Sequence, residues 1–183
     1  MKRMRADPLA RRRSLVFLAR FIGILFFFFF TVALRPVNDV VIVPLTGSIA
    51  AVSATLLKAL GEAVTVDGTE IRSTEFAVNI QNGCNGLETV LLLGSAVLAF
   101  PANWRRRAAG LFAGFLAIEL LNFARVVSLF WVGRHRPALF SSSHTVLWQS
   151  VVVIFGVVFF LLWARQTETA RTPSPGASPS GAR

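Results

Sequence analysis

Residues 15–34 read LVFLARFIGILFFFFFTVAL, and the only charged side chain among them is Arg20. Crossing a hydrocarbon core of about 30 Å takes about 20 apolar residues in a helix. This run has that length, and it follows the three arginines at positions 11–13. We therefore predict a first transmembrane helix over 15–34, preceded by a basic cytoplasmic N-terminus over 1–14.

The same N-terminal pattern also begins secretory signal peptides. However, the apolar run is longer than a typical signal core, and no convincing small-x-small cleavage site follows it. We interpret it as an uncleaved signal anchor, in which Arg20 reaches back to the inner interface.

Three further segments extend this pattern along the chain, over 84–104, 108–131 and 144–164. The 183 residues are 54% hydrophobic and carry a net charge of +10, and the basic residues cluster at the ends of the apolar runs. That distribution indicates the lipid bilayer as a partner and argues against nucleic acid. A basic loop over 105–107 and a disordered tail over 165–183 then share the cytoplasmic side with the N-terminus.

The segment 35–83 is predicted to be extracytoplasmic, as is a loop over 132–143. If residues 38–60 crossed the membrane, the basic N-terminus and the basic loop would fall on opposite sides, so we expect an interfacial helix there. Residues 64–80 contain β-prone stretches around Asp67-Gly68, which is a hairpin signal. The predicted fold is an all-α integral membrane protein with about four transmembrane helices and a small extracytoplasmic cap containing a β-hairpin.

Cys84, Arg125 and His144 fall at one depth of the predicted helices. Each lies about 27 to 31 Å along its helix from a cytoplasmic basic residue, which places all three near the outer interface. A thiol, a guanidinium and an imidazole on three helices are the groups that a membrane-surface cysteine hydrolase or transpeptidase needs.

The three side chains have distinct hypothetical roles. Cys84 lies between glycines at a helix start, where the helix dipole favours the thiolate of a nucleophile. His144 can take the thiol proton and return it to a leaving amine. Arg125 can stabilise the thiolate or an oxyanion. This chemistry requires no metal and no cofactor.

Each residue also has a structural interpretation. A single cysteine excludes an internal disulfide and is often only a packing residue, although the polar turn around Cys84 is atypical of helix packing. Arg125 can anchor its helix by snorkelling. His144 can be an interfacial residue behind the capping serines 141–143, and His135 is a weaker candidate for the base.

Four other polar residues are predicted to support the site: Asn82, Glu88, Glu119 and Asn122. Glu88 lies one turn inside the helix that starts near Cys84, where it either orients His144 or Arg125 or complements the positive helix end. Asn122 and Glu119 precede Arg125 by one and two turns, which indicates a polar stripe facing the bundle interior.

Three segments resemble the exosortase and archaeosortase family of polytopic membrane proteins: NGCNGLE at 82–88, NFARVV at 122–127 and HTVLWQ at 144–149. That family shares a Cys in a small-residue turn, an Arg after an Asn on the next helix, and a His beginning a later helix. The resemblance covers residues 81 to 164, and the short chain is more similar to the compact exosortase H type than to longer members.

The resemblance implies a cysteine-dependent protein-sorting peptidase or transpeptidase in the cytoplasmic membrane of a prokaryote, acting on the extracytoplasmic side. Its substrates would be secreted proteins that end in a short recognition motif, a hydrophobic helix and a basic tail. The family triad corresponds to Cys84, Arg125 and His144. By this analogy Cys84 forms a thioester with the substrate, which water or an amine then resolves.

Two other functions remain open at the level of sequence. A non-enzymatic accessory or transport subunit would use Arg125, Glu119 and Glu88 as a structural polar network. A thiol redox protein would need a partner thiol from another molecule, because the chain has one cysteine.

Overall fold

The computed structural model describes residues 8–81 and 83–169. The elements follow in this order: α1 (Pro8–Ala33), α2 (Arg35–Val37), the π-helical turn η1 (Asn38–Ile42), α3 (Val43–Ala59), β1 (Thr65–Asp67), β2 (Glu70–Arg72), β3 (Ala77–Asn79), α4 (Leu87–Ala99), α5 (Trp104–His135), α6 (Pro137–Ser142), the π-helical turn η2 (Ser143–Trp148) and α7 (Gln149–Thr169).

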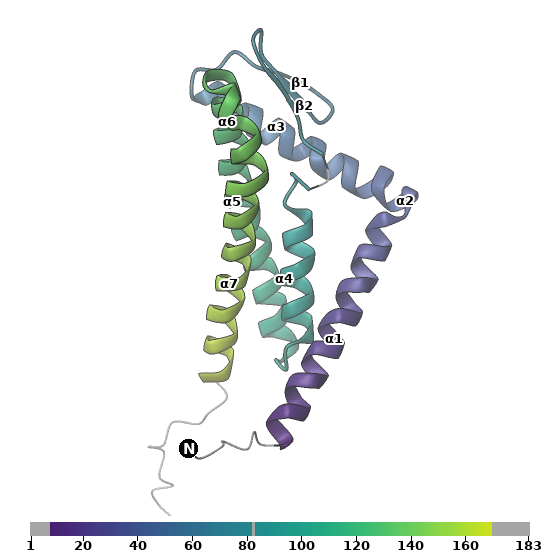
Figure 1. Cartoon of the computed structure of the whole chain (residues 1–183). Helices are drawn as coiled ribbons and strands as arrows, with labels where there is room; N and C mark the ends of the chain where they lie inside the picture. The colour runs from purple at the N-terminus through teal and green to yellow at the C-terminus, as the bar shows by residue number, and fades with distance from the viewer. Residues whose placement is uncertain (1–7, 82, 170–183) are drawn as a thin grey trace, which may run out of the picture.

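Helices α1, α4, α5 and α7 form a bundle, and α3 crosses one end of it beneath the small sheet (Figure 1). Within residues 8–81 and 83–169, four helical segments are long and apolar enough to cross a membrane: Arg11–Ala33, Arg35–Ala59, Trp104–His135 and Pro137–Thr169. Helix α4 is shorter but packs against the other three bundle helices. The predicted fold class, an all-α integral membrane protein with a small β-containing cap, is confirmed.

Helix α3 lies where the interfacial helix was expected. Its length and apolar composition would also permit a membrane crossing. In the structure it runs across the bundle end, steeply inclined to the neighbouring helices (Figure 1). Its buried side packs on the sheet and on α5. An interfacial position for this helix therefore stays our prediction.

The second predicted span, 84–104, is too long at both ends. Gly86 precedes α4 in a left-handed conformation, with φ of 76°, so Cys84 lies in a turn outside the helix. At the other end Pro101 disfavours helical geometry at Phe100, which is extended. Asn103 then caps α5 by accepting a hydrogen bond from the Arg106 N–H at 2.9 Å. The predicted basic loop 105–107 is consequently the first turn of α5.

The predicted loop 132–143 is wrong, because most of it is helical. Helix α5 continues to His135 and breaks only at Arg136. Pro137 then occupies the first turn of α6, where a missing N–H costs nothing, and the helix runs on through η2 and α7 to Thr169. His144 therefore lies inside a continuous helix and does not open one, and the helix outlasts the predicted tail boundary at 165.

The cap is a three-stranded antiparallel sheet in the order β1-β2-β3. Asp67 pairs with Glu70, so the first hairpin turns at Gly68 and Thr69, with Gly68 at φ of 58°. Ile71 pairs with Val78 in the second hairpin. The third strand leads directly into the Cys84 turn.

Aromatic packing and ion pairs join the cap to the end of α5. The Phe76 ring meets the rings of Phe130 and Phe140 edge-on, with centroids 5.7 and 5.5 Å away, and lies against Gly133. Arg134 pairs with Glu62 and Glu75, which follow α3 and precede β3. These contacts fix the position of β3 relative to the helices that carry the site.

Candidate active site

Two left-handed glycines shape the turn that carries Cys84. Gly83 and Gly86 have φ values of 90° and 76°, which side chains with a Cβ rarely adopt. The Cys84 N–H donates to the Gln81 carbonyl at 2.9 Å and closes the turn. Asn82, a predicted supporting residue, lies outside the described residues.

Asn85 fixes this turn to the crossing helix. Its side-chain N–H donates to the Thr46 hydroxyl at 3.1 Å, and that hydroxyl donates to the Ile42 carbonyl at 2.8 Å. Its side-chain oxygen accepts from the Leu87 N–H at 3.1 Å. Both Asn85 and Thr46 are buried. The sequence analysis did not single out this pair; only the polarity of the Cys84 turn pointed toward Asn85.

His144 reaches the thiol from the last long helix. Its Nε2 lies 2.6 Å from Cys84 Sγ. The imidazole stacks on the Phe140 ring, with an interplanar angle of 9° and a centroid distance of 5.9 Å. The wider π-helical turn η2 carries it, and such turns are common where a helix presents a functional side chain.

Arg125 approaches the same sulfur from α5. Its Nη2 lies 3.9 Å from Cys84 Sγ, and its Nη1 donates to the Gly83 carbonyl at 3.4 Å. The residue is 2% exposed, so its charge is shielded from water by the bundle. A shielded guanidinium acts strongly on a nearby sulfur or oxyanion. The structure thus brings together all three predicted catalytic side chains.

Burial raises the pKa of the Cys84 thiol, and the Arg125 guanidinium opposes that change. Glu88 raises the pKa further, while the hydrogen bond with the Gln81 backbone lowers it. The sequence instead led us to expect a lowered pKa from the helix start. Because Cys84 precedes the N-cap residue Gly86, the effect of burial prevails. A raised pKa favours the thiol over the thiolate, and His144 is in contact with the sulfur as a base that can take its proton.

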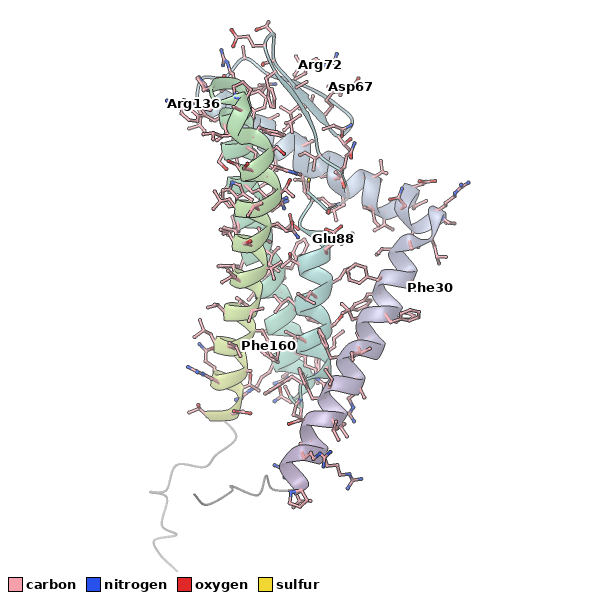
Figure 2. All side chains as sticks on the ribbon, viewed as in Figure 1. Phe30, Asp67, Arg72, Glu88, Arg136 and Phe160 are labelled. Atoms are coloured by element: carbon pink, nitrogen blue, oxygen red, sulfur yellow. The ribbon has the colours of Figure 1, made fainter. Side chains whose placement is uncertain are left out.

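The other predicted supporting residues lie beneath this arrangement. Asn122 and Glu119 are buried on the Arg125 face of α5 and lie close to Gly86, where a Cβ would meet the Asn122 Cγ at 3.3 Å. Glu88 stands at the start of α4 (Figure 2). Among the described residues, it forms no ion pair with Arg125 or His144. Its carboxylate acts on Cys84 through space.

The second histidine is directed elsewhere. His135 stacks on Trp131 with a centroid distance of 4.6 Å, and its Nδ1 lies 3.0 Å from the Trp131 carbonyl oxygen. It does not line the cavity beside Cys84. Within residues 8–81 and 83–169, no group of three or more His, Cys, Asp or Glu side chains could hold a metal ion.

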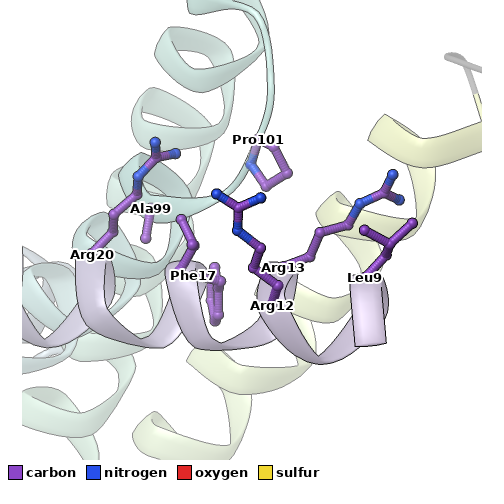
Figure 3. Close-up of a pocket in the computed structure, with 8 residues that line it drawn as sticks. Leu9, Arg12, Arg13, Phe17, Arg20, Ala99 and Pro101 are labelled. Carbon is purple, nitrogen blue, oxygen red and sulfur yellow. The ribbon is translucent and has the colours of Figure 1, made fainter. Parts of the chain in front are cut away.

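A cavity of about 360 Å³ opens beside the thiol. Cys84, Arg125 and His144 all line it. Strand β3 and apolar side chains of α5 and α6 also line it. A different cavity, of about 590 Å³, lies at the opposite end of the bundle among Arg12, Arg13 and Arg20 (Figure 3). Only the first combines a nucleophile with a base.

Comparison with known proteins gives one family. No curated protein and no solved structure matches the chain. The model of the transmembrane exosortase family matches residues 9–164, which include most of the bundle, the cap and all three candidate catalytic side chains. The chain belongs to the transmembrane exosortase family.

Proposed function

We propose that this protein is a membrane-embedded cysteine peptidase or transpeptidase that cleaves C-terminal sorting signals from secreted proteins through a thioester. The observation that carries the proposal is the 2.6 Å approach of Cys84 Sγ to His144 Nε2, with Arg125 beside the same sulfur. Membership of the exosortase family supports an enzyme of this class.

In the first half-reaction, His144 Nε2 removes the Cys84 proton as the sulfur attacks the scissile carbonyl carbon. The carbonyl π electrons move to its oxygen, and the Arg125 guanidinium stabilises the resulting oxyanion. Collapse of this tetrahedral intermediate breaks the C–N bond. The imidazolium returns its proton to the leaving amine, which departs with the hydrophobic helix and basic tail.

In the second half-reaction, water or an amine attacks the thioester carbonyl. His144 accepts the proton of the attacking group, and the Cys84 sulfur leaves and is protonated again. Water yields a free carboxylate, whereas an amine yields a new amide. In each half-reaction His144 therefore acts first as a base toward the attacking group and then as an acid toward the leaving group.

We further propose that the protein lies in the cytoplasmic membrane of a prokaryote with its cap outside. The arginines at 11–13 and 105–107 lie at the bundle end opposite the cap (Figure 1). Short basic segments remain on the cytoplasmic side, so this arrangement directs Cys84 to the extracytoplasmic side. A secreted substrate that is still held by its hydrophobic helix would present its scissile bond there.

The test uses the protein and a secreted protein with a C-terminal hydrophobic helix and basic tail, reconstituted together in liposomes. We expect Cys84→Ser and His144→Gln to abolish cleavage, and the matched variant His135→Gln to retain it. An adduct of the chain with the N-terminal part of the substrate should form and be released by hydroxylamine, which cleaves thioesters. Intact processing by Cys84→Ser would contradict the proposal.

One observation favours this function over a structural polar network, and one measurement distinguishes it from a thiol redox protein. A structural polar network normally satisfies its buried groups. Among the described residues, however, the buried Nε of Arg125 has no hydrogen-bond partner. A redox protein would give an adduct released by reductant, because its single cysteine can form only mixed disulfides.

A further inference from the structure

The outer edge of β3 is unpaired among the described residues, since the sheet order is β1-β2-β3. The register shows which backbone groups face that edge. The Ser73 N–H donates to the Phe76 carbonyl at 2.8 Å, and the Ile80 N–H donates to the Thr69 carbonyl at 3.0 Å. Residues 76, 78 and 80 therefore direct their backbone groups toward β2. Alternation leaves the N–H and C=O groups of Ala77 and Asn79 directed to the free edge.

This edge borders the cavity beside Cys84. The cavity touches five consecutive residues, Ala77 to Gln81. Successive side chains of a strand point to opposite faces, so a space that touches all five runs along the backbone edge and not over one face. The apolar side chains of Leu129 and Phe140 also line this cavity.

From these contacts we infer that the substrate segment around the scissile bond binds in extended form, as a fourth strand on β3. The inference rests on the proposed function. Backbone hydrogen bonds to Ala77 and Asn79 would hold the segment, and every second substrate side chain would face the apolar lining residues Leu129 and Phe140. The three residues of β3 span about 10 Å, so the recognised segment is short.

This binding mode explains why the sheet leads straight into the nucleophile turn. A strand bound along β3 is delivered toward Cys84, because only Ile80 to Gly83 separate β3 from that residue. Phe76 and its aromatic neighbours fix the start of β3 against α5, and Asn85 fixes the turn at its other end. The substrate carbonyl is thus placed by the same structure that places the sulfur.

The test replaces an edge donor without touching the β2 ladder. Ala77→Pro removes an N–H that faces the free edge, and Val66→Pro is the matched control on the opposite edge of the sheet. With the tailed substrate in liposomes, we expect Ala77→Pro to lower kcat/KM about tenfold, mainly through KM, as expected for a lost backbone hydrogen bond. Val66→Pro should match the wild type.

A second measurement leaves the protein unchanged. Substrates N-methylated at one backbone position at a time should lose cleavage at alternate positions near the scissile bond. Equal losses at neighbouring positions, or wild-type kinetics in Ala77→Pro, would overturn strand binding while leaving the peptidase intact.

Binding to the Cys84→Ala variant keeps this inference separate from the proposed function. If the wild type cleaves nothing, the proposed function fails. Strand binding is then decided by affinity alone: retention of the tailed protein with the same alternate-position pattern would support it, and absence of binding would overturn it.

Discussion

Arginines at the two ends of the bundle have opposite environments. Arg125, near the cap, is 2% exposed and faces a thiol. At the other end Arg12, Arg13 and Arg20 are exposed around an open cavity (Figure 3). A guanidinium shielded from water acts strongly on the one reactive group beside it, whereas exposed guanidinium groups are screened. Because both ends carry arginines, burial and neighbouring groups are what distinguish Arg125 as the candidate for the proposed chemistry.

The largest expected effect comes from replacing Arg125, with the replacement of Arg20 at the other end of the bundle as the matched control. Arg125→Gln should lower kcat/KM for the tailed substrate about 100- to 1,000-fold, because the oxyanion loses a preorganised donor. Arg20→Gln removes the same charge at the other end. It should leave kcat/KM unchanged when all protein molecules have the same orientation in the liposome membrane. Similar losses in both variants would show that Arg125 is no more than a membrane anchor.

A pair of glycines on α5 sharpens the comparison. A Cβ at Gly133 would overlap the Phe76 ring at the cap, and a Cβ at Gly110 would overlap the Trp163 ring at the basic end. Both alanine variants should lower the free energy of unfolding by about 1–3 kcal/mol through overpacking. Only Gly133→Ala should also lower the activity of the folded protein, about ten- to a hundredfold, because it shifts the strand beside Cys84.

Thermal unfolding in detergent and cleavage rates per folded molecule measure the two effects separately. If Gly110→Ala lost as much activity as Gly133→Ala, then packing anywhere in the bundle would control the site. The cap would have no special role in holding β3.

The helices and the three catalytic candidates could be predicted because their signals are local. Each apolar run with its basic flank defines a helix, and helix rise converts the position of Arg125 into a depth. The dipeptide Asp67-Gly68 indicates the first hairpin. The continuous helix after Pro137 was missed because a proline behind a charged tripeptide resembles a loop, although proline is also favoured in a first helical turn.

Two supports of the site, the Asn85–Thr46 hydrogen bond and the aromatic contacts of Phe76, could not be predicted, because they join distant segments without any periodic pattern. Asn85 and Thr46 are 39 residues apart, and Thr46 is an ordinary polar interruption in an apolar run. Phe76 falls in the β-prone region 64–80, yet nothing in its sequence neighbours indicates that it contacts the rings of Phe130 and Phe140. Such contacts follow only from the way the cap lies on α5.

The smallest expected effect is a change in the pH dependence of thiol alkylation. Burial raises the pKa of Cys84 and Arg125 lowers it, so the wild-type midpoint should lie above that of a free cysteine. Only the thiolate reacts, and therefore a higher pKa moves the midpoint to higher pH. Arg125→Gln removes a lowering influence and should move the midpoint further up. Glu88→Gln removes a raising influence and should move it down, while Arg20→Gln should not move it.

Cys84 is the only cysteine in the chain, so the measured rate belongs to this group alone. A midpoint that moves equally in Arg20→Gln and Arg125→Gln would mean that the two ends of the bundle do not differ in their electrostatic action on the thiol.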